Sequence, residues 1–351
     1  MDNQASSRPF TILLADDGSQ HAQAAAEMIC DLPLGQGSQV IVLGVLAPRD
    51  ASGHARMSEI LQQRCACFEE KGVSAGTALL VGYPAQVIVE YAGEVEPDLI
   101  VAGARGLRAT LGILLGGVAQ QVVEYADWPV LVVRGPYRGL KRVLVLTDGS
   151  RYSQYMLDYL SGRAVNQTTV ADEEQWREKV YPSGSYLRVS QRYEGANQIK
   201  EGMPGRRFPL APDIEVHVVH VLPPLFESAV LEQMWLTGGE YTGAYVPLAL
   251  EEVEKDNSAA VEREEREGRA LLETALTHLR EGGIQAIGTL LRGDAATEVM
   301  QYIEDNHIDL AICGSRGLGQ MQGWLLGSFS RKMVHYADCS VLVVKGPLPK
   351  E

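Results

Sequence analysis

Residues 309–317 read DLAICGSRG, and nine residues separate this stretch from the pair GS at 327–328. Its first five residues form a short apolar run, which is typical of a buried strand in a parallel sheet. Apolar residues after 328 recur at helical spacing, so the glycines fall on a crossover from strand to helix. Glycine lets the backbone approach a ligand or another segment closely, and the amides at a helix N-terminus bind anions. The stretch therefore predicts an α/β fold with a phosphate site or a tight turn at this crossover.

A second copy of this stretch lies earlier in the chain, as GARG at 103–106 and GG at 116–117. Corresponding residue numbers differ by 211, as 314 and 103 do. Two further segments also recur: the run ending in DGS at 17–19 returns at 148–150, and VIVLGVL at 40–46 returns as VHVVHVL at 216–222. Each half alternates near-continuous apolar strands with helices, the pattern of a parallel sheet covered on both faces.

The repeat predicts two tandem, Rossmann-like domains of open parallel sheet, at residues 8–135 and 140–346, joined by a short Gly/Pro linker. The second domain carries two insertions, at about 163–209 and 224–260. The first is polar, and its alternating stretch at 186–193 is expected to form an edge strand or hairpin. The second is expected to contain a helix at about 226–235 and then to enter a long helix near 248–280. That long helix is strongly acidic, so we expect a solvated face, with a partner surface as the alternative.

Length, charge and cysteine content limit the class of protein. A chain of 351 residues fits two domains of ~150 residues with some surplus. The formal net charge of −14 argues against nucleic acid or an anionic membrane as the main partner. No run of ~20 apolar residues or signal peptide is evident, so we expect no membrane span. The five cysteines form no CxxC pair or zinc-type cluster, which fits a reducing, cytoplasmic setting.

Three motifs together carry a family resemblance: the strand ending in DGS, GYPA at 82–85 before a helix, and G-x2-G-x9-G-S before the last helix. In this order they resemble the universal stress proteins, and the chain resembles a tandem member with two such domains. The likeness covers all but the two insertions. It implies an open sheet of the adenine nucleotide alpha hydrolase-like type. One branch of the family binds ATP or AMP through the glycine motif, while another lacks the motif and binds no nucleotide.

The resemblance implies a stress-response or regulatory protein that binds ATP, AMP or ADP, with Mg²⁺, chiefly in its second half. Asp148, with Thr147 before it, would hold the ribose or adenine side, and the backbone of Val221 would meet the adenine. The phosphates would lie against the glycine motif and the helix after it, at Gly314, Ser315, Arg316, Gly317, Gly327, Ser328 and Phe329.

The first half has a less complete motif. Its matching residues are Asp17, Val45, Gly103, Arg105, Gly106, Gly116 and Gly117. Ala104 and Gly117 stand where the second half has Ser315 and Ser328, so two hydroxyls are missing. Losing one hydrogen bond to a phosphate costs ~1.5–3 kcal/mol, so we expect this site to be weaker or empty. The alternative is that its glycines serve only the turn and the packing of helix on strand.

Other features also have two interpretations. The DGS segments are expected to form turns and helix N-caps. They are also expected to approach the crevice beyond the carboxyl ends of the strands, where open parallel sheets bind ligands. His220, inside an apolar strand, is expected to be a core histidine rather than a catalytic group. Spacing indicates no catalytic residues, no metal ligands and no P-loop lysine, so at most a weak ATPase is expected. A slow ATP hydrolase or nucleotidyl-transfer enzyme, and an interaction scaffold without nucleotide, are the alternative functions.

The final strands of the two halves, at 129–133 and 341–344, are those that members of this family use to pair domains. We expect them to pair with each other inside this chain and form a pseudo-dimer. Further association into a homodimer is also open.

Overall fold

A computed structural model of the chain describes residues 9–48, 53–106, 115–163, 207–225, 246–316 and 326–346, with only the backbone of 246–260. The expected hairpin at 186–193, the expected helix at 226–235 and the candidate ligand Gly317 lie outside these residues. No helix in the described part of the chain is both long and apolar enough to cross a membrane.

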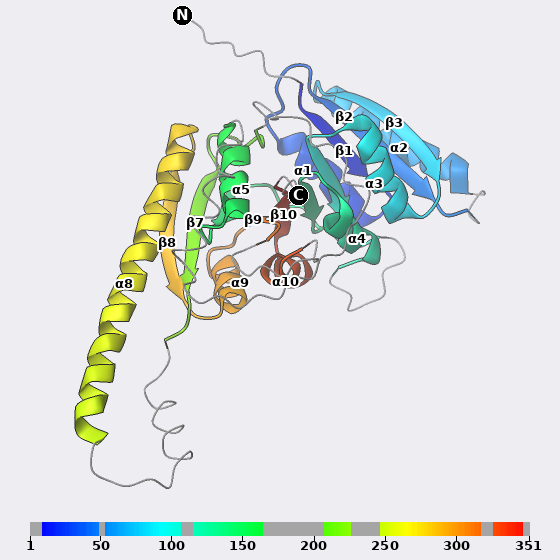
Figure 1. Ribbon diagram of the computed structural model, residues 1–351. Coiled ribbons are helices and arrows are strands. Elements are labelled where there is room, and N and C mark those ends of the chain that lie inside the picture. The colour runs from blue at the N-terminus through cyan, green and yellow to red at the C-terminus, as the bar shows by residue number, and fades with distance from the viewer. Residues whose placement is uncertain are drawn as a thin grey trace, which may run out of the picture.

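The described strands form one sheet across both halves of the chain (Figure 1). The first half contributes β1 (Thr11–Ala15), β2 (Gln39–Leu46), β3 (Ser74–Val81), β4 (Leu99–Gly103) and β5 (Val130–Val133). The second contributes β6 (Arg142–Leu146), β7 (Glu215–Leu222), β8 (Ala286–Arg292), β9 (Leu310–Gly314) and β10 (Ser340–Val344). Their order is β3-β2-β1-β4-β5-β10-β9-β6-β7-β8, and neighbours within each half are parallel. The predicted open α/β fold is therefore confirmed.

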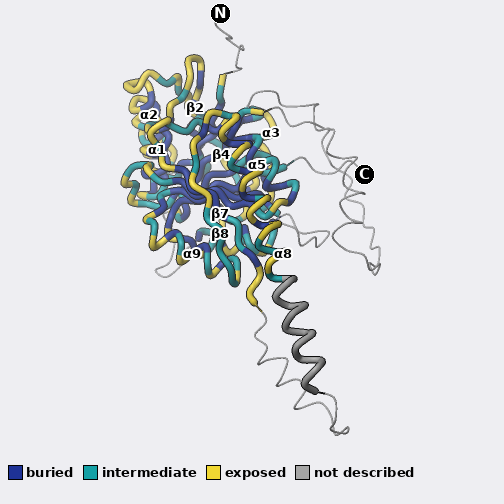
Figure 2. The backbone as a smooth tube through the Cα atoms, turned by 90° about the vertical axis from the view of Figure 1, so that its left-hand side faces the viewer, coloured by how far each residue is buried: buried dark blue, intermediate teal, exposed yellow. Residues whose placement is uncertain are grey.

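Helices cover both faces of this sheet. One face carries α1 (Gln20–Asp31), α2 (His54–Glu70), α5 (Arg151–Ser161) and α8 (Val246–Glu281). The other carries α3 (Pro84–Val95), α4 (Gly117–Tyr125), α9 (Ala295–Asp305) and α10 (Ser328–Tyr336). Alternate strand residues supply the two cores, since Ile12 and Leu14 pack on the first face and Leu13 on the second. Figure 2 shows the buried strands between the more exposed outer helices.

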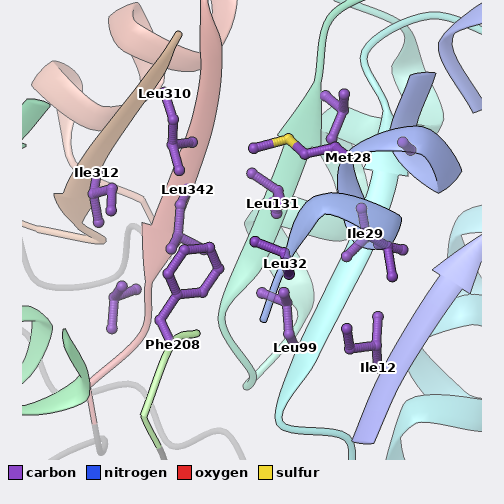
Figure 3. Packing of buried hydrophobic residues seen from close by; sticks show 14 of the residues in the cluster. Ile12, Met28, Ile29, Leu32, Leu99, Leu131, Phe208, Leu310, Ile312 and Leu342 are labelled. Atoms are coloured by element: carbon purple, nitrogen blue, oxygen red, sulfur yellow. The ribbon is translucent and has the colours of Figure 1, made fainter. Parts of the chain in front are cut away.

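The two halves join at β5 and β10, which are the antiparallel pair of the sheet. Leu131 pairs with Leu342 at the centre of this seam, and both side chains are 0% exposed. The hydrophobic core continues across it, from Leu99 and Leu131 in the first half to Leu342 and Leu310 in the second (Figure 3). Tyr159 adds a hydrogen bond between the halves, because its hydroxyl donates to the carbonyl of Asp98 at 3.0 Å. The expected pairing of the last strands within the chain is confirmed.

Basic residues after the two seam strands each reach the last helix of the opposite half. Arg134, after β5, donates to the carbonyls of Val334 at 2.9 Å and His335 at 3.2 Å, near the end of α10. Lys345, after β10, donates to the carbonyl of Glu124 at 3.3 Å, near the end of α4. Cations at helix C-termini satisfy terminal carbonyls and complement the helix dipole. The seam is thus closed by a reciprocal pair of cationic contacts.

Burial at the seam changes the proton affinity of Lys345. Desolvation lowers its pKa from the ordinary value of 10.5 to about 8, and the charge of Arg316 acts in the same direction. Asp127 and Glu124 oppose the shift without cancelling it. Folding therefore disfavours the ammonium form of Lys345 relative to its neutral form.

Lys345→Met should remove a pH dependence of stability. Between pH 8 and 10.5 the unfolded chain binds more protons at Lys345 than the folded chain, so wild-type stability should rise across this window. At ~1.4 kcal/mol per pKa unit, the rise is at most ~3 kcal/mol. Urea unfolding at about pH 7.5 and about pH 10 should show the wild type gaining stability relative to the variant. The exposed control Lys141→Met should keep the wild-type profile, and parallel profiles for all three proteins would contradict the assignment.

Candidate functional site

The strand order reverses once in each half, between β1 and β4 in the first half and between β6 and β9 in the second. Loops beyond the carboxyl ends of parallel strands diverge at such a point, which makes it the usual ligand position in open α/β sheets. We call the residues that follow β1 and β4, with the start of α4, the first site. Those that follow β6 and β9, with the start of α10, form the second site.

The DGS segments form the turns that lead into α1 and α5. Gly18 has a φ of 77°, in the left-handed region that glycine tolerates. Asp17 Oδ1 accepts a hydrogen bond from the amide of Ser19 at 3.0 Å, and Ser19 Oγ accepts one from the amide of Ala22 at 3.1 Å. The second half repeats both bonds at 148–150. The expected turn and N-cap roles are confirmed.

In the first site, the residues after β1 and β4 meet. A Cβ on Gly106 would overlap Oδ2 of Asp17, so a side chain at 106 would displace that carboxylate. Ser19 Oγ also donates to the carbonyl of Arg105 at 3.2 Å. In this half the segment after β1 and the glycine loop after β4 are therefore in contact.

A buried ion pair supports the first site from behind. Asp16 is 2% exposed, and its Oδ2 lies 2.9 Å from Nε of Arg64 on α2. Its Oδ1 accepts from the amide of Gly18 at 2.7 Å, which fixes the turn. The corresponding residues of the second half are Thr147 and Ala275, so the ion pair is specific to the first. Sequence reasoning missed Arg64, because only the α2 register brings it to the turn.

In the second site, hydrogen bonds hold the start of α10 against the loop after β9. The amide of Gly327 donates to the carbonyl of Ser315 at 2.8 Å. Ser330 Oγ donates to the carbonyl of Gly314 at 2.7 Å. Ser315 and Ser330 are buried, whereas Ser328, the first residue of α10, is exposed. Of these three hydroxyl groups, Ser328 therefore has the access to reach a ligand.

The arginine of each glycine loop lies against the first turn of the helix that follows DGS. Arg316 Nη1 donates to Oη of Tyr152 at 3.4 Å, and its guanidinium carbon is 5.7 Å from the ring centre. In the first site, Arg105 Nε donates to Nε2 of His21 at 3.1 Å. Tyr152 and His21 were not among the predicted site residues. Their matching positions after the two DGS turns are the signal that could have found them.

Two of the motif glycines are required by packing. A Cβ on Gly103 would lie 2.7 Å from the carbonyl carbon of His21, and one on Gly314 would lie 2.8 Å from that of Tyr152. Such distances are shorter than any ordinary Cβ contact, so the strand end can approach the helix only without a side chain. Gly117 differs, because a Cβ there would meet nothing within 4 Å. At Gly103 and Gly314, glycine is therefore required by the packing of helix on strand.

The two strand valines that were expected to lie near the adenine, Val45 and Val221, are half-buried. Val45 and Val221 pack against the core on the side of α3 and α9. His220 faces α8, and its Nδ1–H donates to the carbonyl of Thr147 at 2.9 Å. Its ring lies 3.3 Å from the position of a Cβ on Gly268. His220 is therefore a packed, hydrogen-bonded histidine, as predicted.

Comparison with known proteins gives a consistent match. The model of the Universal stress protein family matches residues 10–134 and 206–345. A universal stress protein of Thermus aquaticus is 38% identical over 134 residues, which cover 35% of this chain and 98% of that protein. Universal stress protein YxiE of Bacillus subtilis is 32% identical over 80 residues, covering 23% of this chain and 54% of that protein. The latter alignment thus spans about half of the relative's length.

A solved structure shows the same fold. A universal stress protein of Archaeoglobus fulgidus superposes with a TM-score of 0.55 at 17% identity, covering 95% of this chain and 98% of that one. A universal stress protein solved in complex with cAMP is 28% identical, with a TM-score of 0.31, covering 36% of this chain and 98% of its own.

Alanine substitutions should separate packing glycines from the others. Gly314→Ala should lower the free energy of unfolding by ~1–3 kcal/mol, because its methyl group would overlap the backbone of Tyr152. Gly117→Ala should leave stability unchanged or raise it by ~0.5 kcal/mol, since the methyl group has room and the unfolded chain loses freedom. Urea unfolding followed by circular dichroism measures both. Equal losses in the two variants would show that the close approach at Gly314 is not what requires glycine.

Proposed function

The chain belongs to the universal stress protein family, and from this premise we propose that it binds an adenine nucleotide (ATP, or AMP or ADP), chiefly at the second site, as a regulatory ligand. Bound nucleotide would bias the conformation of the chain or its affinity for a partner, as any ligand does that prefers one of two states. Signalling in a stress response is the role that such binding would serve.

The N-terminus of α10 carries this proposal. The first amides of a helix have no acceptor within the helix, and its dipole adds partial positive charge there. Phosphate suits such a position, because amide and hydroxyl groups can donate to its oxygens. Ser328 supplies an exposed hydroxyl at the first position, followed by the amide of Phe329. The bond from Gly327 to Ser315 holds this terminus beside the loop that carries Arg316.

Differences between the halves favour the second site. Three serines around its loop, Ser315, Ser328 and Ser330, correspond to Ala104, Gly117 and Ala119 in the first site. We assign a ligand contact to Ser328 and a positioning role to Ser330, because Ser330 already donates to the carbonyl of Gly314. The first site keeps its backbone amides but has neither the ligand hydroxyl nor the positioning hydroxyl. Its affinity for nucleotide should therefore be lower.

The remaining roles follow the family pattern. Asp148 and Thr147 would face the ribose or adenine, the backbone of Val221 would meet the adenine, and Gly317 would complete the phosphate loop. In the described ranges, no group of three or more His, Cys, Asp or Glu side chains could hold a metal ion. Mg²⁺ would therefore enter with the nucleotide, coordinated mainly by phosphate oxygens and water.

The proposal also covers the cellular compartment and the oligomeric state. The five cysteines are free thiols, which supports a reducing cytoplasm. The strands that pair domains in this family, β5 and β10, already pair with each other. A homodimer of this chain would therefore have to form through a different surface.

Reciprocal substitutions should test both the function and the choice of site. Calorimetric titration of the full chain with Mg²⁺–ATP should show binding in the wild type, weakened ~10–100-fold by Ser328→Gly through the lost hydrogen bond. Gly117→Ser, the matched change in the first half, should leave the tighter site intact and strengthen the weaker one. Absence of binding at millimolar ATP would refute the proposed function. If Asp17→Asn weakened the binding of Mg²⁺–ATP and Ser328→Gly left it unchanged, the nucleotide would bind in the first half.

A further inference from the structure

Two guanidinium groups meet at one phenol oxygen in the second half. Arg151 is the first residue of α5, and its Nη2 donates to Oη of Tyr152 at 3.2 Å. Nη1 of Arg316, in the loop after β9, donates to the same oxygen at 3.4 Å. The two guanidinium carbons lie 5.1 Å and 5.7 Å from the centre of the Tyr152 ring. Tyr152 therefore holds together a helix residue and a loop residue that are far apart in the sequence.

The ring that receives both arginines is fixed in the core. Tyr152 is 3% exposed, and its ring meets that of Tyr155 edge to face, with 6.4 Å between the ring centres. Its backbone lies directly against Gly314 at the end of β9. Arg151 and Arg316 are only half-buried, so both guanidinium groups keep access to solvent. The buried phenol thus sets the position of two cations that a ligand can reach.

This arrangement concentrates positive charge. Both guanidinium groups stay charged at any pH at which the protein is folded, and two such charges beside one atom repel each other. The dipole of α5 adds partial positive charge at the same end of the helix. The chain as a whole carries a net charge of −14, so the cluster is opposite in sign to the average surface. A polyanion that contacts both arginines would replace this repulsion by attraction, and guanidinium groups match phosphate oxygens in geometry.

The first half does not repeat the pair of arginines. Gln20 and His21 follow its N-cap, where the second half has Arg151 and Tyr152. Among the matched positions, only Arg105 carries a guanidinium group there, and its Nε donates to Nε2 of His21 at 3.1 Å. The second site therefore has one more permanent positive charge beside its glycine loop than the first site has.

We propose that Arg151 and Arg316 bind the part of a nucleotide's phosphate chain beyond its first phosphate, and that Tyr152 positions both. This inference rests on the proposed function, since it concerns the ligand of the second site. A single phosphate finds donors in the amides and hydroxyl at the start of α10 and in one arginine. Each further phosphate adds negative charge and oxygens that need donors, which the second guanidinium supplies. The second site thus selects nucleoside triphosphates over monophosphates.

The test is calorimetric titration of the full chain with AMP and with the Mg²⁺ complexes of ADP and ATP. The wild type should bind ATP at least ~10-fold more tightly than AMP, with ADP between them, because hydrogen bonds to charged phosphate oxygens are strong. Equal affinities for ATP and AMP would overturn this inference and leave the proposed function intact. If none of the three nucleotides bound, the proposed function itself would fail.

Replacing Arg151 separates its contribution from that of the rest of the site. Arg151→Gln introduces the residue that the first half has at this position. It should weaken ATP binding ~10-fold and AMP binding by less than ~2-fold. Arg280→Gln, a change of equal charge at an exposed residue near the end of α8, should alter neither affinity. Unchanged ATP binding in Arg151→Gln, or equal weakening of ATP and AMP, would contradict the role of Arg151.

Tyr152→Phe tests the positioning role, because it keeps the ring and removes the oxygen that both arginines contact. The preference for ATP over AMP should fall ~3-fold or more, the effect of one lost hydrogen bond. A residue that serves packing alone would change stability without changing this preference, and that outcome would refute the positioning role. Circular dichroism checks that each variant is folded, and the wild-type comparison of ATP with AMP needs no variant.

Discussion

The structure depends on the antiparallel pairing of β5 with β10. This contact joins two parallel sheets into one, because the buried side chains of both strands interlock at the centre of a continuous core. Burial of apolar surface is the dominant favourable term in such packing, and the backbone groups of both strands find partners there. The cationic contacts of Arg134 and Lys345 follow from the same pairing, since each residue extends its strand onto the opposite half. Changes at the seam should therefore affect both halves together.

The glycine motif combines two physical requirements that sequence alone does not separate. At Gly103 and Gly314, the strand end lies so close to the next helix that no side chain fits. At Gly117 there is free space, and the corresponding Ser328 places a hydroxyl at the start of α10. The packing glycines are shared by both halves, while the serines differ. A motif can therefore persist for folding in one half and still support binding in the other.

Much of the fold could be predicted from the sequence, because the period at which apolar residues recur and the repeated spacing of the motifs can be recognised along the chain. The strands, the two halves and the N-caps follow from them, whereas the in-chain pairing of the last strands was expected from the family resemblance. Tyr152, His21 and Arg64 were missed, since their contacts depend on how helices from distant segments lie against the loops. The nucleotide and the roles of its ligands stay predictions, since they come from resemblance.

Covalent fusion of the two halves has an evolutionary consequence. In a symmetric homodimer, every substitution occurs twice, so two equivalent sites must change together. In this chain the halves already differ: Asp16 with Arg64 in one correspond to Thr147 with Ala275 in the other, and Gly44 with Met57 correspond to His220 with Gly268. At each of these positions the two halves fill the same place in the fold with different side chains. Because each half has its own stretch of one chain, a change in one half leaves the matching position of the other unchanged.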